Sequence, residues 1–310
     1  MALSDSNICE LNRATMYVGS RQAPQPIASL FVPDTLRHGT TGVETLFRSI
    51  SELPSAERYL FDMSSVSFIE PCGVMALLYA VRQCADLSGK RVLINNLGNQ
   101  IYPYLHRMDF FRVANAWVRP LAPLNEEWSR NEHTINLLEL TPVTGYDDMI
   151  TVVERARGIF GPLLSSDELS NLLRVISELC QNIYQHSGDT HGCVVIQKYQ
   201  PEPNRVFICL SVGDSGCGIR SNLIKHYRWL GNDPLDFVRA AMDGNFTSRP
   251  NRRGGLGLRT VRNITAAHRG YVTVRSESAG VTDWGKSVQS SGNLAHISGT
   301  QVSVKMCVSI

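Results

Sequence analysis

Three short polar and glycine-rich segments follow one another in the C-terminal half of the chain, each beside an expected helix or strand. Residues 178–186 end a long helical pattern, residues 214–219 follow an apolar strand, and residues 254–258 precede an apolar helical pattern. Glycine at such junctions lets the backbone turn tightly and approach other groups without a Cβ clash. The order and setting of these segments constrain the fold more than any one of them does alone.

The composition is typical of a folded, soluble protein. Hydrophobic residues make up 43% of the 310 residues and charged residues 19%, which favours a globular chain over a disordered one. The net charge of +2 gives no indication of nucleic-acid binding. Because no apolar run can span a bilayer and no signal-peptide pattern occurs, we expect a cytoplasmic protein with no direct nucleic-acid or membrane partner.

The cysteines predict no metal or redox site. The chain has eight, and none forms a Cys-x-x-Cys pair. Several lie within apolar runs, as Cys209 does. We therefore expect free thiols that are buried as small hydrophobic side chains.

The N-terminal half alternates expected strands with expected helices. Residues 1–25 lack sustained periodicity and are predicted to be a loose arm. Strands are predicted near 27–32, 59–61 and 91–94, and helices over about 43–53, 74–85 and from 101 onward. This alternation predicts an α/β domain over residues 26–117. Residues 118–133 have two prolines, mixed charges and no periodicity, so we predict a linker there.

The second domain is predicted over residues 134–310. It is expected to begin with a strand at 135–140 and a helix near 147–159, followed by a longer helix from about 166 to 185. Ser165 or Ser166 is its expected N-cap. Further strands are predicted at 193–197, 206–212, 271–275 and 301–308, and a hairpin or loop over 279–298.

The three ordered segments together resemble the ATP-binding boxes of the GHKL superfamily, which includes gyrase, heat-shock chaperone, histidine kinase and mismatch-repair ATPases. The resemblance covers roughly residues 135–310. It implies a Bergerat-fold α/β sandwich that binds ATP and Mg²⁺. Gly299 and Thr300, before the last strand, resemble the final box of the superfamily, in which the threonine assists adenine recognition.

Under this resemblance the first segment carries metal and base chemistry. Glu178, Asn182 and His186 are four residues apart and share one helix face. The carboxamide of Asn182 suits a Mg²⁺ site that leaves room for water and phosphate oxygens, and Glu178 suits a catalytic base. The segment alone is equally typical of an exposed helix face, and His186 of a structural histidine at a helix end.

The second segment carries the expected adenine contact. Asp214 follows a strand, where a buried carboxylate can accept a hydrogen bond from the exocyclic amino group of adenine. Gly216 and Gly218 allow close backbone approach, and Ile219 completes the set of expected binding residues here. A glycine-rich turn after a strand is the plain structural alternative for this segment.

The third segment opens a helix, whose first backbone N–H groups form a natural phosphate site. The polar stretch before it, over residues 244–253, is expected to act as a lid. Its arginines are typical both of phosphate contacts and of a solvated loop. The expected binding residues of this region are Thr247 in the lid and Gly255, Leu256, Gly257 and Leu258 at the helix start.

Within the superfamily the chain resembles the compact anti-sigma-factor serine kinases. The residues around His106 and His133 do not supply a phosphoaccepting-histidine pattern, and 310 residues do not accommodate the transducer domains of gyrase-like members. Residues 246–248, Phe-Thr-Ser, resemble the lid of the serine kinases.

The N-terminal half resembles the STAS domain of anti-sigma-factor antagonists over about residues 27–115. The match depends on an apolar strand, a short extended segment, a turn and an amphipathic helix within residues 60–85. Where that family has Asp-Ser-Ser-Gly, this chain has Glu-Pro-Cys-Gly at 70–73, so Cys72 replaces the usual phosphoacceptor serine. We expect a docking or dimerising module rather than a substrate, although a packing role explains the sequence equally well.

The fold class expected is therefore α/β, a STAS-like domain followed by a Bergerat-fold sandwich. The function expected is a Mg-dependent serine/threonine kinase of partner-switching type, acting on a separate STAS-like protein. The alternative is a nucleotide-gated switch that captures a sigma-like factor or another regulator with little or no phosphotransfer. A third interpretation is an ATPase clamp in which nucleotide drives closure of a homodimer.

Overall fold

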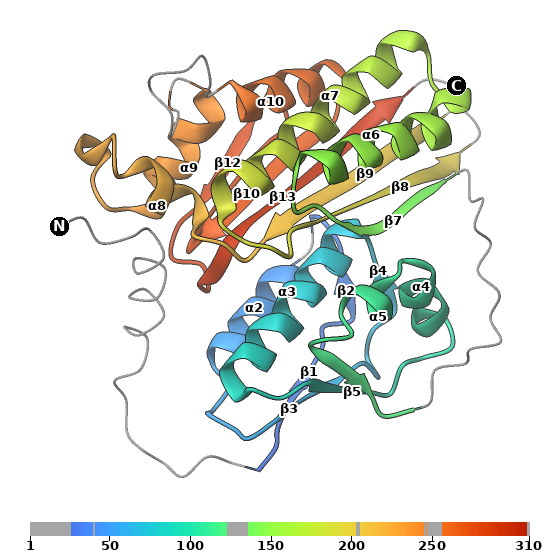
Figure 1. Ribbon diagram of the computed structural model, residues 1–310, viewed down its shortest axis with the longest axis vertical. Helices are drawn as coiled ribbons and strands as arrows, with labels where there is room; N and C mark the ends of the chain where they lie inside the picture. The colour runs from blue at the N-terminus through green and yellow to red at the C-terminus, as the bar shows by residue number, and fades with distance from the viewer. Residues whose placement is uncertain are drawn as a thin grey trace.

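The computed structural model describes residues 26–39, 41–122, 136–202, 205–244, 246 and 256–308. Within these residues the strands form a four-stranded sheet, a two-stranded pair and a seven-stranded sheet. We call the first the N-terminal sheet and the last the large sheet (Figure 1). The predicted arm at 1–25 and most of the predicted lid lie outside the described residues.

The N-terminal sheet is parallel throughout. Its order is β1 (Ala28–Phe31), β3 (Tyr59–Asp62), β5 (Val92–Asn95) and β6 (Val118–Pro120). The chain also forms α2 (Gly42–Ser51), α3 (Pro71–Ser88), α4 (Ile101–Arg107) and α5 (Phe110–Val113), and β2 (Thr35–Leu36) pairs with β4 (Phe68–Ile69). Parallel strands need long crossover connections that bring the chain back to the end of the sheet where the previous strand began, and the helices between these strands are part of those connections.

The prediction that a linker begins at residue 118 is wrong for its first residues. Val118 pairs with Val92 in β6, and only 3% of its surface is exposed. Pro120 argues against a strand in the sequence, because proline cannot donate a ladder hydrogen bond. An edge strand tolerates a proline, since one side of the strand needs no ladder hydrogen bond. Residues 123–135, which include most of the predicted linker, lie outside the described residues.

The large sheet is antiparallel at every described pairing. Its order is β12 (Val288–Ser291), β11 (Ala279–Asp283), β10 (Tyr271–Glu277), β13 (Ile297–Val308), β9 (Arg205–Asp214), β8 (Cys193–Glu202) and β7 (Leu137–Pro142). Its longest helices are α6 (Tyr146–Phe160), α7 (Ser166–Asn182) and α10 (Gly257–Ala267). A hairpin or a loop was predicted over 279–298, and the strands β11 and β12 pair there as a hairpin. Sequence reasoning missed α8 (Gly218–Leu223) and α9 (Pro234–Asp243).

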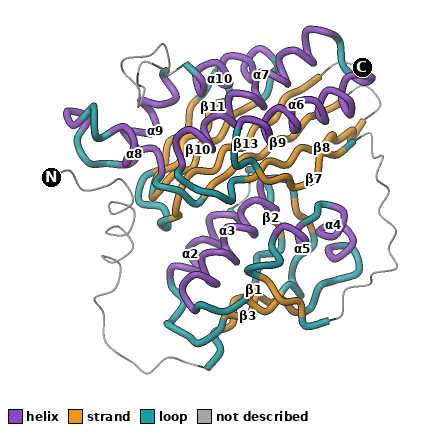
Figure 2. The backbone as a smooth tube through the Cα atoms, in the orientation of Figure 1, coloured by secondary structure: helices purple, strands orange, loops and turns teal. Residues whose placement is uncertain are grey.

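The helix α3 lies between the N-terminal sheet and the large sheet (Figures 1 and 2). The sequence predicted one buried face, with Leu77 and Val81 on it. Met75 and Tyr79, outside that face, are also buried. A helix that is apolar on all sides is typical of a helix enclosed by other elements, and this one is enclosed because it covers β8, β9 and β13 as well as its own sheet.

In the central part of the large sheet, both faces are therefore buried. Along β8, Val194 and Ile196 join the core beneath α6 and α7, whereas Cys193 and Val195 join the core that contains α3. Successive side chains of a strand point to opposite faces, so a continuous apolar run follows from burial on both.

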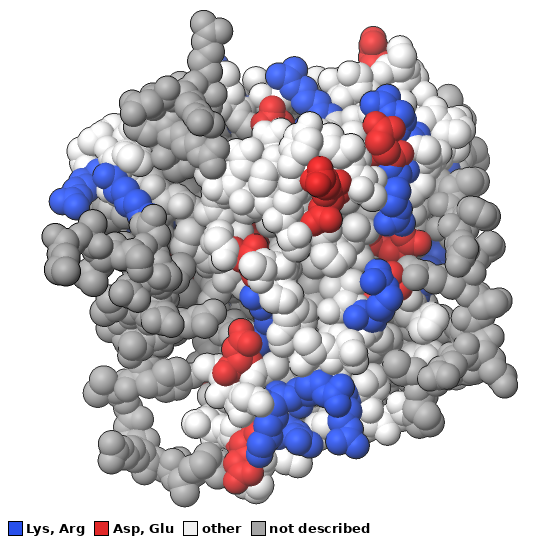
Figure 3. Space-filling model, viewed as in Figure 1, with Lys and Arg blue, Asp and Glu red and all other residues white. Residues whose placement is uncertain are grey.

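The surface carries charge of both signs. Figure 3 shows acidic and basic side chains in the upper and the lower part of the visible face, separated by uncharged residues. No helix in the described part of the chain is long and apolar enough to cross a membrane.

Candidate functional site

The helix α7 begins with a capping box. The hydroxyl of Ser165 accepts a hydrogen bond from the backbone N–H of Glu168, and the Glu168 carboxylate accepts one from the backbone N–H of Ser165. Such reciprocal bonds satisfy donors that a helix start otherwise leaves unpaired. The apolar side of α7 packs in the core, and its last turns present Glu178 and Asn182 to a cavity.

His186 lies beyond α7, in a single π-helical turn that spans Ile183–Ser187. Such turns widen the helix and are frequent at functional sites. The backbone carbonyl of His186 accepts a hydrogen bond of 2.7 Å from the Asn222 side chain. The turn ends at Gly188, whose φ of 69° is accessible to glycine. His186 also lines the cavity.

Asp214 is the last residue of β9, where it pairs with Thr300 of β13. Its side chain is buried, and its Oδ1 accepts a hydrogen bond of 2.8 Å from the backbone N–H of Gly216. Burial raises the pKa of Asp214 to about 7, because desolvation outweighs the hydrogen bonds from the Gly216 and Thr300 backbones. Near neutral pH this carboxyl therefore exists in both protonation states.

Two glycines permit the close packing around Asp214. A Cβ at Gly216 would lie 1.9 Å from the carbonyl oxygen of Ser187, and one at Gly299 would lie 2.2 Å from the carbonyl oxygen of Asp214. Both contacts involve backbone atoms that cannot rotate away. Gly216 thus shapes the loop beside the cavity without lining it, whereas Gly218, at the start of α8, lines the cavity itself.

The N-terminus of α10 approaches the end of α7. A Cβ at Gly257 would lie 3.0 Å from Oε2 of Glu178 and 3.8 Å from Oδ1 of Asn182. The first backbone N–H groups of this eleven-residue helix are thus close to both side chains. The predicted binding residues Thr247 and Gly255 lie outside the described residues.

The predicted residues meet in one cavity of about 580 Å³. Its volume lies within the range of small-molecule sites, roughly 300–1,000 Å³. The predicted residues that line it are Glu178, Asn182, His186, Asp214, Gly218, Ile219, Leu256, Gly257, Leu258 and Thr300. Four stretches that are separated in the sequence, at 178–186, 214–219, 256–258 and 300, therefore contribute to a single site.

The family comparison covers this same part of the chain. Residues 167–306 match the family model described as "Histidine kinase-, DNA gyrase B-, and HSP90-like ATPase". The matched range runs from the start of α7 to the end of β13 and includes every described wall of the cavity. This part of the chain is a GHKL-type ATPase domain.

Similar proteins carry histidine-kinase names. Over 121 residues the chain is 27% identical to "Hybrid signal transduction histidine kinase D" of Dictyostelium discoideum, a match that covers 38% of this chain and 7% of that protein. Among solved structures, "Mycobacterial sensor histidine kinase MprB" shares 18% identity at a TM-score of 0.29, over 55% of this chain and 98% of the other. The histidine kinase domain of the Erythrobacter litoralis blue-light activated kinase EL346 shares 11% identity at a TM-score of 0.25, over 86% and 92%.

A GHKL-type domain implies ATP binding, and the donors of this cavity fit that nucleotide. The Asp214 carboxyl can accept from an exocyclic amino group, and the α10 N-terminus offers N–H groups to phosphate. For Mg²⁺ the described residues contain no group of three His, Cys, Asp or Glu side chains that could hold a metal. Asn182, which the sequence predicts as a Mg²⁺ ligand, lines the cavity, and its amide oxygen is a kind of ligand that Mg²⁺ accepts together with phosphate oxygens and water.

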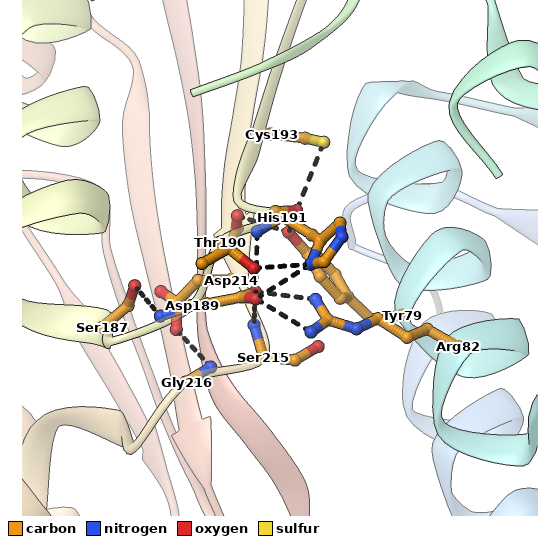
Figure 4. A network of polar contacts seen from close by, with 11 residues as sticks. Tyr79, Arg82, Ser187, Asp189, Thr190, His191, Cys193, Asp214, Ser215 and Gly216 are labelled. Atoms are coloured by element: carbon orange, nitrogen blue, oxygen red, sulfur yellow. Dashed lines mark hydrogen bonds and ion pairs between the residues drawn. The ribbon is translucent and has the colours of Figure 1, made fainter. Parts of the chain in front are cut away.

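Sequence reasoning did not find Asn222, whose side chain lines the cavity and donates a hydrogen bond to the π turn. It placed Phe246 in the expected lid without assigning it to the site, and Phe246 also lines the cavity. The helix that carries Asn222, α8, has six residues and no sustained apolar period, so no periodic signal exists there. Three further residues, Tyr79, Arg82 and Asp189, contact the loops beside Asp214 (Figure 4).

Proposed function

We propose that this chain is an ATP-binding regulatory protein that transfers the γ-phosphoryl group of ATP to a serine or threonine of a separate, STAS-like protein. The observation that carries the proposal is the meeting of Asp214, Asn182 and Glu178 in one cavity. These three residues offer a base-reading carboxyl, a neutral metal ligand and a carboxylate next to the helix N-terminus that would receive phosphate.

Each residue has a distinct proposed role. Asp214 in its ionised form accepts a hydrogen bond from the adenine amino group, and Asn182 contributes an oxygen to Mg²⁺. Glu178 takes the proton of the attacking hydroxyl as its oxygen bonds to phosphorus and ADP leaves. When bound, Mg²⁺ neutralises phosphate charge.

The position of the Glu70–Gly73 turn supports a substrate on another protein. His38 donates its backbone N–H to the Glu70 carboxylate, and its ring stacks on Tyr271 of β10 at 3.6 Å between ring centroids. Cys72 lies in the same turn and is half-buried, and desolvation raises the pKa of its thiol above the ordinary value. This turn is therefore covered by the large sheet on the face away from α7, where the cavity's phosphate end cannot reach it.

The histidine-kinase names of the relatives suggest a phosphoaccepting histidine as another possibility. His106 lies in α4, which has seven residues. A helix of this length is too short to form the long dimerisation helix of a histidine kinase, and His133 lies outside the described residues. The serine/threonine proposal is therefore preferred for this chain.

A second candidate function is a nucleotide-gated binding switch with little phosphotransfer. It is favoured by the hydrogen bond from the Tyr79 hydroxyl to the carbonyl of Gly213, next to Asp214. Through this contact, occupation of the cavity can shift the N-terminal half and change the surface that it offers to a regulator.

The experiment follows the γ-phosphate of labelled ATP. Purified protein is incubated with lysate of its source organism, with and without a chelator of Mg²⁺. We expect one Mg-dependent labelled protein other than the chain itself, and a loss of labelling of about 10²–10⁴-fold in Glu178→Ala. The matched control is Glu154→Ala, on the exposed side of α6.

A second measurement separates binding from transfer. Glu178→Ala should still bind a non-hydrolysable ATP analogue, whereas Asp214→Asn should bind it more weakly. Equal loss of binding in both variants would contradict the assigned roles. Binding of the analogue with no labelled product in any fraction would replace the kinase by the nucleotide-gated switch.

A further inference from the structure

An ion pair joins α3 to the loops beside the cavity. The guanidinium of Arg82 donates two hydrogen bonds to the carboxylate of Asp189, at 2.7 and 2.8 Å (Figure 4). Only 11% of the Arg82 side chain and 2% of the Asp189 side chain are exposed. Planar, two-point pairing of this kind has a defined geometry as well as favourable energy.

Asp189 links Arg82 to the loop that follows Asp214. Its carboxylate also accepts hydrogen bonds from the backbone N–H groups of Ser215, at 2.8 Å, and His191, at 3.0 Å. Ser215 directly follows Asp214 in the chain. Burial alone would raise the pKa of Asp189, but these bonds and Arg82 hold it below the ordinary value, so the residue stays ionised near neutral pH.

A second contact reaches the other side of Asp214. The Tyr79 hydroxyl donates a hydrogen bond of 2.5 Å to the carbonyl of Gly213, which directly precedes Asp214. A Cβ at Gly213 would lie 2.7 Å from the Tyr79 ring, so the residue must be a glycine for α3 to approach. Tyr79 and Arg82 are three residues apart and therefore project from the same face of α3.

We propose that Tyr79 and Arg82 are positioning residues for Asp214, so that the N-terminal half determines how tightly the cavity binds an adenine nucleotide. Neither side chain lines the cavity, and they act through Gly213, Asp189 and Ser215. The inference rests on the proposed ATP binding and adds its regulation. Any partner that displaces α3 changes nucleotide affinity, and bound nucleotide changes the affinity for that partner to the same extent.

The charges around Asp214 affect the pH midpoint of nucleotide binding, which a purely structural role of Arg82 would leave unchanged. Asp189 raises the pKa of Asp214 and Arg82 lowers it, in addition to the larger effect of burial. Three other titratable groups lie in this network: the Tyr79 hydroxyl, the His191 ring, which is 3.8 Å from the Asp189 carboxylate, and the Cys193 thiol, which donates to the His191 carbonyl. Loss of the Arg82 charge should therefore move the pH midpoint of nucleotide binding upward.

The experiment compares two ion pairs that join the same halves of the molecule. Binding of the non-hydrolysable analogue AMP-PNP is measured by calorimetry from pH 5.5 to pH 8.5 for wild type, Arg82→Gln and Glu44→Gln. The carboxylate of Glu44, on α2, pairs with the guanidinium of Arg275 on β10 rather than with Asp189 or the backbone next to Asp214. We expect Arg82→Gln to weaken binding about ten-fold and raise the midpoint, while Glu44→Gln leaves both close to wild type.

Two further variants protect the test against a folding defect. Arg82→Lys keeps the charge without the two-point geometry, so it should restore the midpoint but only part of the affinity. Tyr79→Phe removes the hydroxyl that bonds to Gly213. It should weaken AMP-PNP binding several-fold, and the pH midpoint of binding should not fall below that of the wild type. If Arg82→Gln fails to fold, Tyr79→Phe decides, and wild-type affinity in that variant overturns the inference.

The outcomes separate the inference from the proposed function. If the wild-type protein does not bind AMP-PNP at any pH, the proposed function is overturned and the inference falls with it. If the wild type binds and Arg82→Gln matches Glu44→Gln in affinity and midpoint, only the inference is overturned.

Discussion

One face of the large sheet, which we call the helix face, packs against α6, α7 and α10 from the same half of the chain. The other face, which we call the α3 face, packs against α3 from the N-terminal half. On the α3 face, Tyr79 bonds to Gly213, which is 134 residues later in the chain. The first face is covered by a continuous apolar core, to which the ion pairs of Arg155 with Glu139 and of Arg262 with Asp283 add contacts within the same half of the chain. The second combines apolar contacts with buried polar ones, which include Arg82 with Asp189 and Arg275 with Glu44.

The difference teaches how two halves of a chain acquire one relative orientation. Apolar burial favours contact but tolerates many arrangements, because it has no direction. Buried hydrogen-bonded charges are costly in every arrangement that leaves them unpaired. On the α3 face the polar contacts therefore select one docking of the N-terminal half, and one of them lies beside Asp214.

The largest effect should come from breaking the buried ion pair of the α3 face. Asp189→Ala leaves Arg82 buried without its carboxylate, so the free energy of unfolding should fall by about 3–5 kcal/mol. Urea-induced unfolding of the variant and the wild type measures this loss of stability. The control is Glu154→Ala on the helix face, where both partners of an exposed pair with Arg157 remain hydrated and the loss should be about 0.5 kcal/mol or less. Similar losses in both variants would remove the contrast between the faces.

A next, smaller effect should come from a methyl group at the contact of α3 with β9. Gly213→Ala inserts a Cβ 2.7 Å from the Tyr79 ring and should cost about 1–3 kcal/mol of stability. The matched control is Gly158→Ala in α6, where nothing lies within 4 Å of the added Cβ and a gain of about 0.5–1 kcal/mol is expected. Thermal unfolding of both variants checks the pair. A neutral Gly213→Ala would mean that α3 packs less closely than described.

The pH dependence of nucleotide binding sharpens the comparison at Asp214. Since adenine recognition needs the carboxylate and its pKa is raised to about 7, affinity for AMP-PNP should rise about ten-fold from pH 6 to pH 8. Asp214→Asn should lose this rise and retain only the change that comes from the phosphates of the ligand. A wild-type profile identical to that of Asp214→Asn would exclude the carboxyl from binding.

The same group has a stability effect of opposite direction. In the protein without ligand, Asp214 favours its protonated form, so its contribution to the free energy of unfolding is complete below the ordinary value of 3.8 and is lost as the pH rises through about 7. Unfolding of wild type and Asp214→Asn at pH 5 and pH 8 measures this difference. The wild type should lose stability relative to the variant at the higher pH.

The smallest effect should come from the start of α7 on the helix face. Ser165→Ala removes the N-cap and should lower stability by about 1 kcal/mol without changing the affinity for AMP-PNP, because the cap lies at the far end of α7 from Asn182. Ser166→Ala, one residue later, has no cap bond to lose and serves as control. A change in affinity from Ser165→Ala would show that the helix face also transmits strain to the cavity.

Sequence reasoning recovered the local parts of the candidate site. Ser165 or Ser166 was expected to cap the long helix, and Ser165 is the cap. Glu178 and Asp214 were expected near a helix end and a strand end, and both line the cavity. These placements depend on period, caps and glycines, which are properties of a few consecutive residues. The roles assigned to them remain predictions.

The sequence did not reveal what lies behind the site. Arg82 and Asp189 are 107 residues apart, and neither belongs to a motif. The apolar run along α3 was interpreted as one buried face, although its second face is what contacts β9. The length of that run, with almost no polar residue between 71 and 81, was the available signal for a helix enclosed on both sides.

The sequence by itself determined where most of the longer helices and strands form, how α7 begins, and which loops carry the glycine and carboxyl groups that line the cavity. These features arise from interactions between residues close in the chain. Only the tertiary structure decided that α3 covers the large sheet and that Arg82 meets Asp189 beside the Asp214 loop. Such contacts depend on the path of the whole chain, because an ion pair has no local signature until two distant segments are packed together.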